Sequence, residues 1–203
     1  MNLKEQQSQG AYNKLAKNYD NTFDGRFTRP FKDELVSQVI LKDGDAVLDV
    51  ACGTGELLAR LNDKCNIRGA GIDISDEMIK VAKSKYDKFD FLVSSCAPLP
   101  FKENTFDVLT VSAAFHHFPE PKKFASEALR VLKRGGKLYI AEVYFPIPIR
   151  QIMNLLVLPL YNSGDVKIYH SKELTEMFTR AGFLNVSVIK KGKIQLLYAD
   201  KGI

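Results

Sequence analysis

Short apolar runs alternate along this chain with longer stretches in which apolar residues recur every three or four positions. The short runs have the length of buried β-strands, and the longer stretches have the period of α-helices. This alternation is typical of a parallel sheet that carries helices on both faces. The predicted strands are residues 46–51, 69–73, 90–93, 106–112, 137–143, 184–189 and 194–199.

Helices are predicted between these strands, and several residues at their ends support the assignment. Ser75 stands at the position of an N-cap, and the glycines at 135 and 136 are predicted to end a helix. A Lys-Gly-Lys turn joins the last two strands, which implies an antiparallel pair. We therefore predict an α/β fold, a doubly wound, mostly parallel, seven-stranded Rossmann-like sheet with an antiparallel C-terminal edge hairpin. The predicted helices are residues 55–62, 76–85, 122–132 and 172–181.

Two segments lie outside this pattern but within what we expect to be a single domain of residues 1–203. Residues 1–41 are predicted to form a helical cover, with helices around 12–19 and 31–40. Residues 146–168 follow the fifth strand, so they should lie near the carboxyl ends of the strands, where open α/β sheets bind ligands. Their stretch 151–164 holds no charged residue. We expect a helical lid over an apolar substrate; a core helix and a contact with a membrane surface are the alternatives.

The most informative stretch is residues 48–57, which read LDVACGTGEL. An apolar run carrying Asp49 enters a Gly-Thr-Gly turn and then a helical pattern, so a ligand can lie against bare backbone at a helix N-terminus. Asp73 ends the next apolar run, and an acid there can accept hydrogen bonds from a ribose diol. These features predict a cofactor that contains a nucleoside.

Two observations favour S-adenosylmethionine over a dinucleotide as the cofactor. The dinucleotide pattern G-x-G-x-x-G requires a third glycine where this chain has Leu58, which weakens the interpretation as an NAD-dependent dehydrogenase. A carboxylate at Asp49 would repel a pyrophosphate and attract the ammonium and sulfonium groups of S-adenosylmethionine.

Five segments in a fixed order carry a resemblance to a known family: AYNKLAKNYD (11–20), LDVACGTG (48–55), GIDIS (71–75), APLPFKENTFDVL (97–109) and EALRVLKRGGKLYIAE (127–142). They resemble the class I S-adenosylmethionine-dependent methyltransferases, most closely the small-molecule enzymes of the ubiquinone/menaquinone-biosynthesis type. The resemblance implies an enzyme that uses S-adenosyl-L-methionine and releases S-adenosyl-L-homocysteine. The cofactor-binding residues that it implies are Tyr12, Tyr19, Asp49, Ala51, Cys52, Gly53, Gly55, Asp73, Ile74, Met78, Ser95, Cys96, Ala97 and Ala113.

One position departs from the family pattern. The family commonly has an acid that accepts a hydrogen bond from the adenine amino group, and this chain has Ser95 there. A hydrogen bond to a neutral acceptor contributes ~1 kcal/mol, against ~1.5–3 kcal/mol to a charged one. On this basis the substitution Ser95→Asp is expected to tighten cofactor binding.

The candidate catalytic residues are His116 and His117, which follow the fourth predicted strand. A histidine doublet at a ligand-facing strand end could orient or deprotonate an acceptor; packing or capping of the next helix is the alternative. Tyr12 and Tyr19 combine an apolar ring with a polar tip, which suits closure over the methionine end of the cofactor, or packing of the N-terminal helix. A metal site formed by Cys52 and Cys96 with His116 and His117 is an alternative, but no ligand pair has C-x-x-C spacing, so no metal is expected. The cysteines are interpreted as small buried thiols.

Composition and charge limit the kinds of partner that we expect for this protein. The net charge of +5, from 29 basic and 24 acidic residues, does not demand a nucleic acid. The polar N-terminus lacks a signal-peptide core, and 151–164 is too short to span a bilayer, which suggests a cytoplasmic protein with peripheral membrane contact possible. We expect methyl transfer to a small, apolar or aromatic acceptor. A non-catalytic cofactor-binding regulatory module and an RNA methyltransferase are the alternatives. The acceptor, the methylated atom and the oligomeric state stay open.

Overall fold

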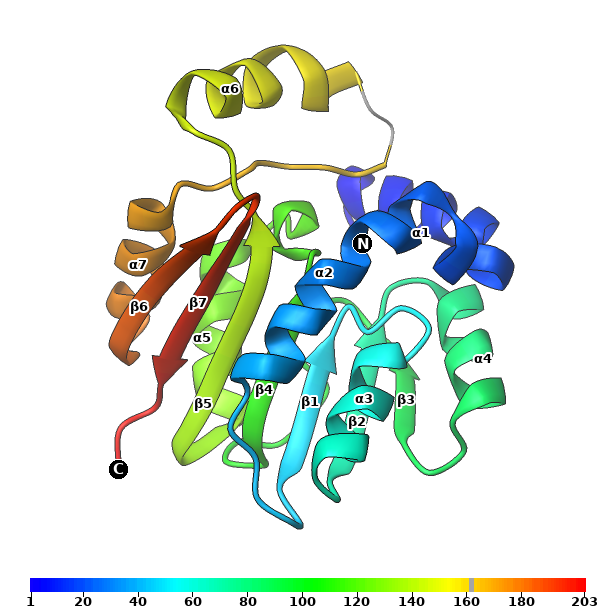
Figure 1. Cartoon of the computed structure of the whole chain (residues 1–203), viewed down its shortest axis with the longest axis vertical. Helices are drawn as coiled ribbons and strands as arrows, with labels where there is room; N and C mark the ends of the chain where they lie inside the picture. The colour runs from blue at the N-terminus through cyan, green and yellow to red at the C-terminus, as the bar shows by residue number, and fades with distance from the viewer. Residues whose placement is uncertain (161–162) are drawn as a thin grey trace.

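The computed structural model describes residues 1–160 and 163–203, and its strands form one seven-stranded sheet in the order β3-β2-β1-β4-β5-β7-β6 (Figure 1). Strands β1 to β5 are parallel to one another, and β7 is antiparallel to both β5 and β6. The predicted doubly wound, mostly parallel sheet with an antiparallel edge hairpin is therefore confirmed. The strands are β1 Ala46–Val50, β2 Arg68–Asp73, β3 Asp90–Val93, β4 Phe106–Ser112, β5 Leu132–Val143, β6 Leu184–Lys191 and β7 Ile194–Asp200.

Helices cover both faces of the sheet, as the alternating pattern predicts. One apolar cluster takes in Phe124 and Phe178, and a second takes in Leu35, Leu58 and Ile79. Strand β1 lies between these clusters, and all five of its residues are buried. The helices between strands are α3 Glu56–Lys64, α4 Asp76–Lys85, α5 Pro121–Val131 and α7 Ser171–Arg180.

The N-terminal helices have different bounds from those predicted. Helix α1 spans Leu3–Leu15, a 3₁₀ helix η1 spans Ala16–Asn21, and α2 spans Phe23–Gln38. The first helix starts early because the side chain of Asn2 accepts from the backbone N–H of Glu5 while the Glu5 carboxylate accepts from that of Asn2, which is a capping box.

The prediction that Gly135 and Gly136 end the helix over residues 122–132 is also wrong. Helix α5 ends at Val131, and β5 begins at once with Leu132, which is buried and pairs with Phe106 of β4. Gly135 lies inside the strand with a φ of 72°, and its N–H donates to the carbonyl of Lys201 at 2.6 Å. Burial of Leu132 and these tail contacts extend the strand beyond the predicted residues.

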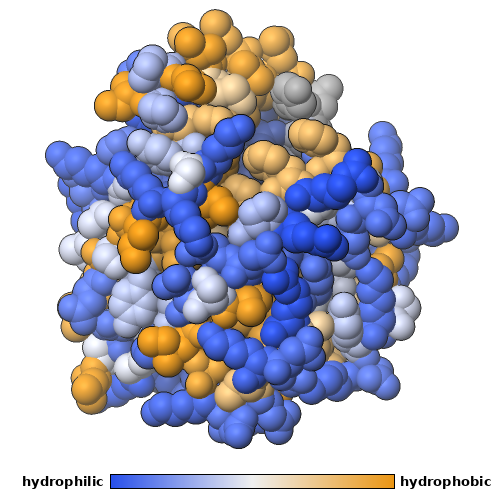
Figure 2. Space-filling model, in the orientation of Figure 1, coloured by the Kyte–Doolittle hydropathy of each residue, from blue (hydrophilic) through white to orange (hydrophobic). Residues whose placement is uncertain are grey.

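The segment after β5 lies beyond the carboxyl ends of the strands (Figure 1). It contains α6 Ile147–Ile152, a π-helical turn η3 Met153–Val157 and a 3₁₀ turn η4 Leu158–Leu160; residues 161–162 of the predicted lid lie outside the described residues. Leu155 is 75% exposed and Leu160 81%, so this segment is not a core helix. Figure 2 shows the apolar surface that results. In the described part of the chain, no helix combines the length and hydropathy needed to cross a membrane.

Gly55 sits at the start of α3 with a φ of 81°, and a Cβ there would lie 2.7 Å from Cζ of Phe91. Gly44 has a similar φ of 84° but open space around it. We expect Gly44→Ala to lower the free energy of unfolding by about 1 kcal/mol through backbone strain alone. Gly55→Ala should cost clearly more, because Phe91 must also move. Urea unfolding of both variants measures the difference, and equal losses would contradict this account.

Candidate functional site

A cavity opens at the carboxyl ends of β1, β2 and β4, between the sheet and the N-terminal helices. Its place, at the carboxyl ends of parallel strands, is where open α/β sheets bind ligands. The lining residues that the sequence singled out are Tyr12, Tyr19, Asp49, Ala51, Cys52, Gly53, Asp73, Ile74, Met78, Cys96, Ala113 and His117. Gly55, Ser95, Ala97 and His116 are outside this lining.

The Asp73 carboxylate connects the glycine loop to the end of β2. It accepts hydrogen bonds from the N–H of Gly53 at 2.9 Å and from the N–H of Ser75 at 2.8 Å. Gly53 has a φ of 53°, which glycine adopts readily. Ser75 is the N-cap of α4, as expected, since its hydroxyl accepts from the N–H of Met78. These hydrogen bonds fix the Asp73 carboxylate at the cavity wall. Its oxygens keep lone pairs that can accept further hydrogen bonds.

Asp49 is a second buried acid at this wall. It is 2% exposed, and it accepts one hydrogen bond from the Thr110 hydroxyl at 2.8 Å. Burial raises the pKa of Asp49 to about 7, against the hydrogen bond from Thr110. No lysine or arginine of the described residues forms a salt bridge with Asp49 or Asp73. The cavity thus offers two acids that lack a paired cation.

Two alanines beside these acids adopt a left-handed backbone. Ala51 follows β1 with a φ of 59°, and Ala113 follows β4 with a φ of 49°. This conformation is costly for a residue with a Cβ and clusters at functional sites. Both alanines line the cavity, so the two central strands turn sharply where they meet it.

At the β3 side of the cavity, the N-terminal helix supplies an acid. Ser95 follows β3, and its hydroxyl donates to Oε1 of Glu5 at 2.6 Å. Glu5 lines the cavity together with Ser94 and Cys96, whereas Ser95 is not part of the lining. Reasoning from the sequence did not select Glu5, although the Asn2-x-x-Glu5 spacing is a readable helix-start signal.

At the β4 side, the two histidines point in different directions. Nε2 of His117 lies 2.9 Å from the Tyr12 hydroxyl at the cavity wall. His116 faces Glu142 at the end of β5, with Nδ1 2.8 Å from Oε1. Burial lowers the pKa of His117, with the nearby His116 adding to the effect. Although burial opposes the charge of His116, Glu142 raises its pKa.

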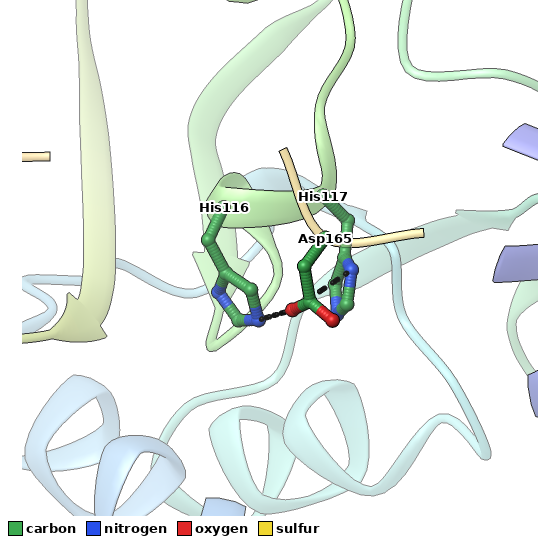
Figure 3. A group of neighbouring side chains, drawn as sticks. All are labelled: His116, His117 and Asp165. Atoms are coloured by element: carbon green, nitrogen blue, oxygen red, sulfur yellow. Dashed lines mark ion pairs between the residues drawn. The ribbon is translucent and has the colours of Figure 1, made fainter. Parts of the chain in front are cut away.

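Asp165, from the segment before α7, stands between the two imidazoles (Figure 3). Neither Asp165 nor Glu142 was selected from the sequence. Glu142 ends a buried strand, which is the signal that identified Asp49 and Asp73. For Asp165 the sequence holds no such signal, because a loop brings it to the histidines.

Comparisons with known proteins show which proteins the chain resembles. A family profile described as a methyltransferase domain matches residues 48–140. A demethylmenaquinone methyltransferase of Bacillus licheniformis is 27% identical over 210 residues, which cover 90% of each chain. An uncharacterised protein of Methanocaldococcus jannaschii is 41% identical over 126 residues, which cover 62% of this chain and 47% of that protein, so the chain matches about half of that relative's length.

A solved structure shows the same fold. The phosphoethanolamine N-methyltransferase 2 of Haemonchus contortus in complex with S-adenosyl-L-methionine aligns with a TM-score of 0.71 at 15% identity, covering 95% of this chain and 60% of that one. With the sheet order and the acid-lined glycine loop, these likenesses support a class I S-adenosylmethionine-dependent methyltransferase, and demethylmenaquinone methyltransferases are among the proteins that the chain resembles. In that solved structure the bound cofactor is S-adenosyl-L-methionine.

The residues at the cavity fit this cofactor. A cationic sulfonium and ammonium compensate buried carboxylates, and a ribose diol suits the free lone pairs of Asp73. The hydroxyl oxygen of Ser112 is buried at the cavity wall without a hydrogen-bond partner among the described residues, which leaves it available to a polar ligand.

The raised pKa of Asp49 predicts how stability depends on pH. Between the ordinary aspartate pKa of 3.8 and about 7, the unfolded chain loses this proton while the folded chain keeps it, so the free energy of unfolding falls as pH rises through this window. Without cofactor, Asp49→Asn should therefore be more stable than wild type at pH 8, by a few kcal/mol at about 1.4 kcal/mol per pKa unit, and equal near pH 4.

Urea unfolding across this pH range tests the prediction. Asp107→Asn is the matched control, because desolvation is opposed by the bonds from Lys133 and the N–H of Ala46, which together with nearby positive charge hold the pKa of Asp107 below its usual value. That variant should lose stability above pH 4 instead. An Asp49→Asn protein that is less stable than wild type at pH 8 would show that the ionised carboxylate is not a cost in the ligand-free fold.

Proposed function

We propose that this protein transfers a methyl group from S-adenosylmethionine to a small, apolar or aromatic acceptor of the quinol or phenol class. The observation that carries the proposal is the cavity at the β4 side, where Tyr12 and His117 form a hydrogen-bonded pair beside Ala113 and the aromatic ring of Phe118. This end combines two polar groups with apolar walls, which suits an acceptor that has one hydroxyl on a ring. The demethylmenaquinone methyltransferases that resemble the chain act, by their name, on a ring of this kind.

The cofactor supplies, when bound, an electrophilic methyl group on a sulfonium. The chain's own part is to position the groups and to exclude water. The loop at residues 51–55 and the carboxylate of Asp73 would hold the ribose, and Asp49 would face the cationic end. Tyr12 and His117 would orient the acceptor oxygen, and the closed N-terminal helices would keep water out.

The helical segment 146–168 supports an apolar acceptor. None of its described residues lines the cavity, yet Ser163 accepts from the Ser8 hydroxyl of α1 at 3.0 Å, and Asp165 reaches the histidines. Its apolar side chains stand in solvent, so an apolar acceptor or a bilayer that carries one would give them a partner surface. We propose that this segment is a lid that covers the entrance for the acceptor.

The alternative is a module that binds the cofactor and regulates a partner without turnover. Binding of S-adenosylhomocysteine is expected in both cases, so only methyl transfer separates them. We expect a panel of demethylated quinols and phenols, with methyl-labelled cofactor, to yield a labelled organic product. Asp73→Ala is the negative control, because it removes the ribose contact and should weaken cofactor binding by roughly 1–3 kcal/mol. Saturable cofactor binding with no product across quinols, phenols, amines and RNA would favour the regulatory module.

A second proposal concerns adenine. Asp73 ends β2 and Ser95 follows the neighbouring strand β3, so a ribose at Asp73 would direct the base toward Ser95 and Glu5. We propose that the Glu5 carboxylate accepts from the adenine amino group, in place of the acid that the family has at position 95. The Ser95 hydroxyl would then orient Glu5. This changes our expectation for Ser95→Asp, because a second carboxylate beside Glu5 adds like-charge repulsion.

The ratio of affinities for two ligands tests this role. S-inosylhomocysteine carries a carbonyl where the adenine ring carries its amino group. Wild type should prefer S-adenosylhomocysteine roughly tenfold or more, because a charged acceptor repels the carbonyl. Glu5→Gln should reduce that preference several-fold, since an amide can donate to a carbonyl. Ser95→Asp alone should weaken binding, and the double variant with Glu5→Gln should recover it.

The control separates base recognition from helix stability. Asn2→Ala removes the other half of the capping box and leaves the Glu5 carboxylate in place. It should change both affinities alike and leave their ratio unaltered. An unaltered ratio in Glu5→Gln, measured by calorimetry, would mean that Glu5 only caps its helix.

A further inference from the structure

His116, His117 and Asp165 bring three metal-ligating atoms together from two distant parts of the chain. The histidines lie in the 3₁₀ turn η2, which spans Phe115–His117 after β4, and Asp165 lies in the loop before α7. Nε2 of His116, Nδ1 of His117 and a carboxylate oxygen of Asp165 all lie within 4.8 Å of one another. Figure 3 shows the carboxylate between the two rings.

The two separations from Asp165 are longer than hydrogen bonds and close to the spacing of ligands on a shared cation. Oδ1 of Asp165 is 3.5 Å from Nε2 of His116 and 3.6 Å from Nδ1 of His117. Both distances exceed those of N–H···O bonds, which are about 2.7–3.2 Å. Ligands on a tetrahedral ion at about 2.0–2.1 Å lie about 3.3–3.5 Å apart. Consistent with this, Nδ1 of His117 is buried and has no hydrogen-bond partner among the described residues.

Each of the three side chains also has a polar partner at the atom that points away from the cluster. Nδ1 of His116 lies 2.8 Å from Glu142, and Nε2 of His117 lies 2.9 Å from the Tyr12 hydroxyl. The other carboxylate oxygen of Asp165 accepts from the hydroxyl of Ser163. Such outer partners fix the ring orientation and the free nitrogen of metal-binding histidines. The ring nitrogens left over are the two that face Asp165.

The charges of the cluster point the same way. Glu142 is fully buried and Asp165 nearly so, and in the described part of the chain neither carboxylate forms a salt bridge with a lysine or an arginine. Two carboxylates and two neutral imidazoles would balance one divalent cation. Imidazole and carboxylate ligands together suit zinc and similar first-row ions.

We propose that His116, His117 and Asp165 form a three-ligand site for a divalent transition-metal ion of the zinc type. The site would fasten the loop before α7 to η2 and leave a fourth position for water or an oxygen ligand. This goes beyond methyl transfer, because the ion would bind whether or not an acceptor is methylated. His117 would then bind the metal through Nδ1 and the Tyr12 hydroxyl through Nε2.

Titration of the chelator-treated, full-length protein with Co²⁺ tests the site. We expect one ion per chain, visible ligand-field bands of a four-coordinate ion without thiolate charge-transfer, and displacement by Zn²⁺. Asp165→Asn and His116→Gln should each weaken binding at least 100-fold. The matched control is His170→Asn, since His170 is the third histidine of the chain and only caps α7. It should bind as wild type does.

Two further readouts separate this site from adventitious binding. Hydrogen exchange of residues 163–168 should slow when Zn²⁺ is added, and it should not slow in Asp165→Asn. Cys65→Ser should leave the binding unchanged, because Cys65 lies outside the cluster. Absence of stoichiometric binding at micromolar metal, or equal binding by Asp165→Asn and wild type, would overturn the proposal.

Discussion

The site depends on one carboxylate that holds two backbone segments together. Asp73 accepts from the N–H of Gly53 and the N–H of Ser75, so it joins the turn after β1 to the N-terminus of α4. Because the carboxyl ends of β1 and β2 lie side by side in a parallel sheet, a single side chain can reach both. The turn at Gly53 thereby gains a fixed shape without filling the space that the cofactor needs.

That arrangement leaves a buried negative charge. The free-energy cost of burying this charge accounts for other properties of the site. Asp49 and Asp73 both sit in a low-dielectric wall, where burial raises the pKa of each carboxyl group. A cationic cofactor relieves this cost, so affinity for the cofactor and instability of the ligand-free site have the same origin. The left-handed backbone at Ala51 and Ala113 is a further cost at the same place.

The N-terminal helices complete the cavity from outside the sheet. Tyr12 meets His117, Glu5 meets Ser95, and the Asp20 carboxylate accepts from the Thr54 hydroxyl at 3.0 Å. These contacts join residues 34 to 105 positions apart. Closing such long loops costs conformational entropy, which the polar contacts and the burial of the helix must offset. Cofactor bound beneath the helices would add to their stability by mass action.

The sequence by itself determined the sheet, the acid-and-glycine loop and Asp73, because each rests on a local signal. Strand and helix periods repeat within a few residues, and the ends of consecutive parallel strands must meet at one edge. The start of the first helix could have been read from the Asn2–Glu5 capping pair, although the helix was predicted only around residues 12–19. Only the tertiary structure decided that Glu5 stands at Ser95 and that Asp165 stands between His116 and His117. Their partners are set by how a surface helix and a loop pack on the sheet, and no spacing within either segment encodes that contact.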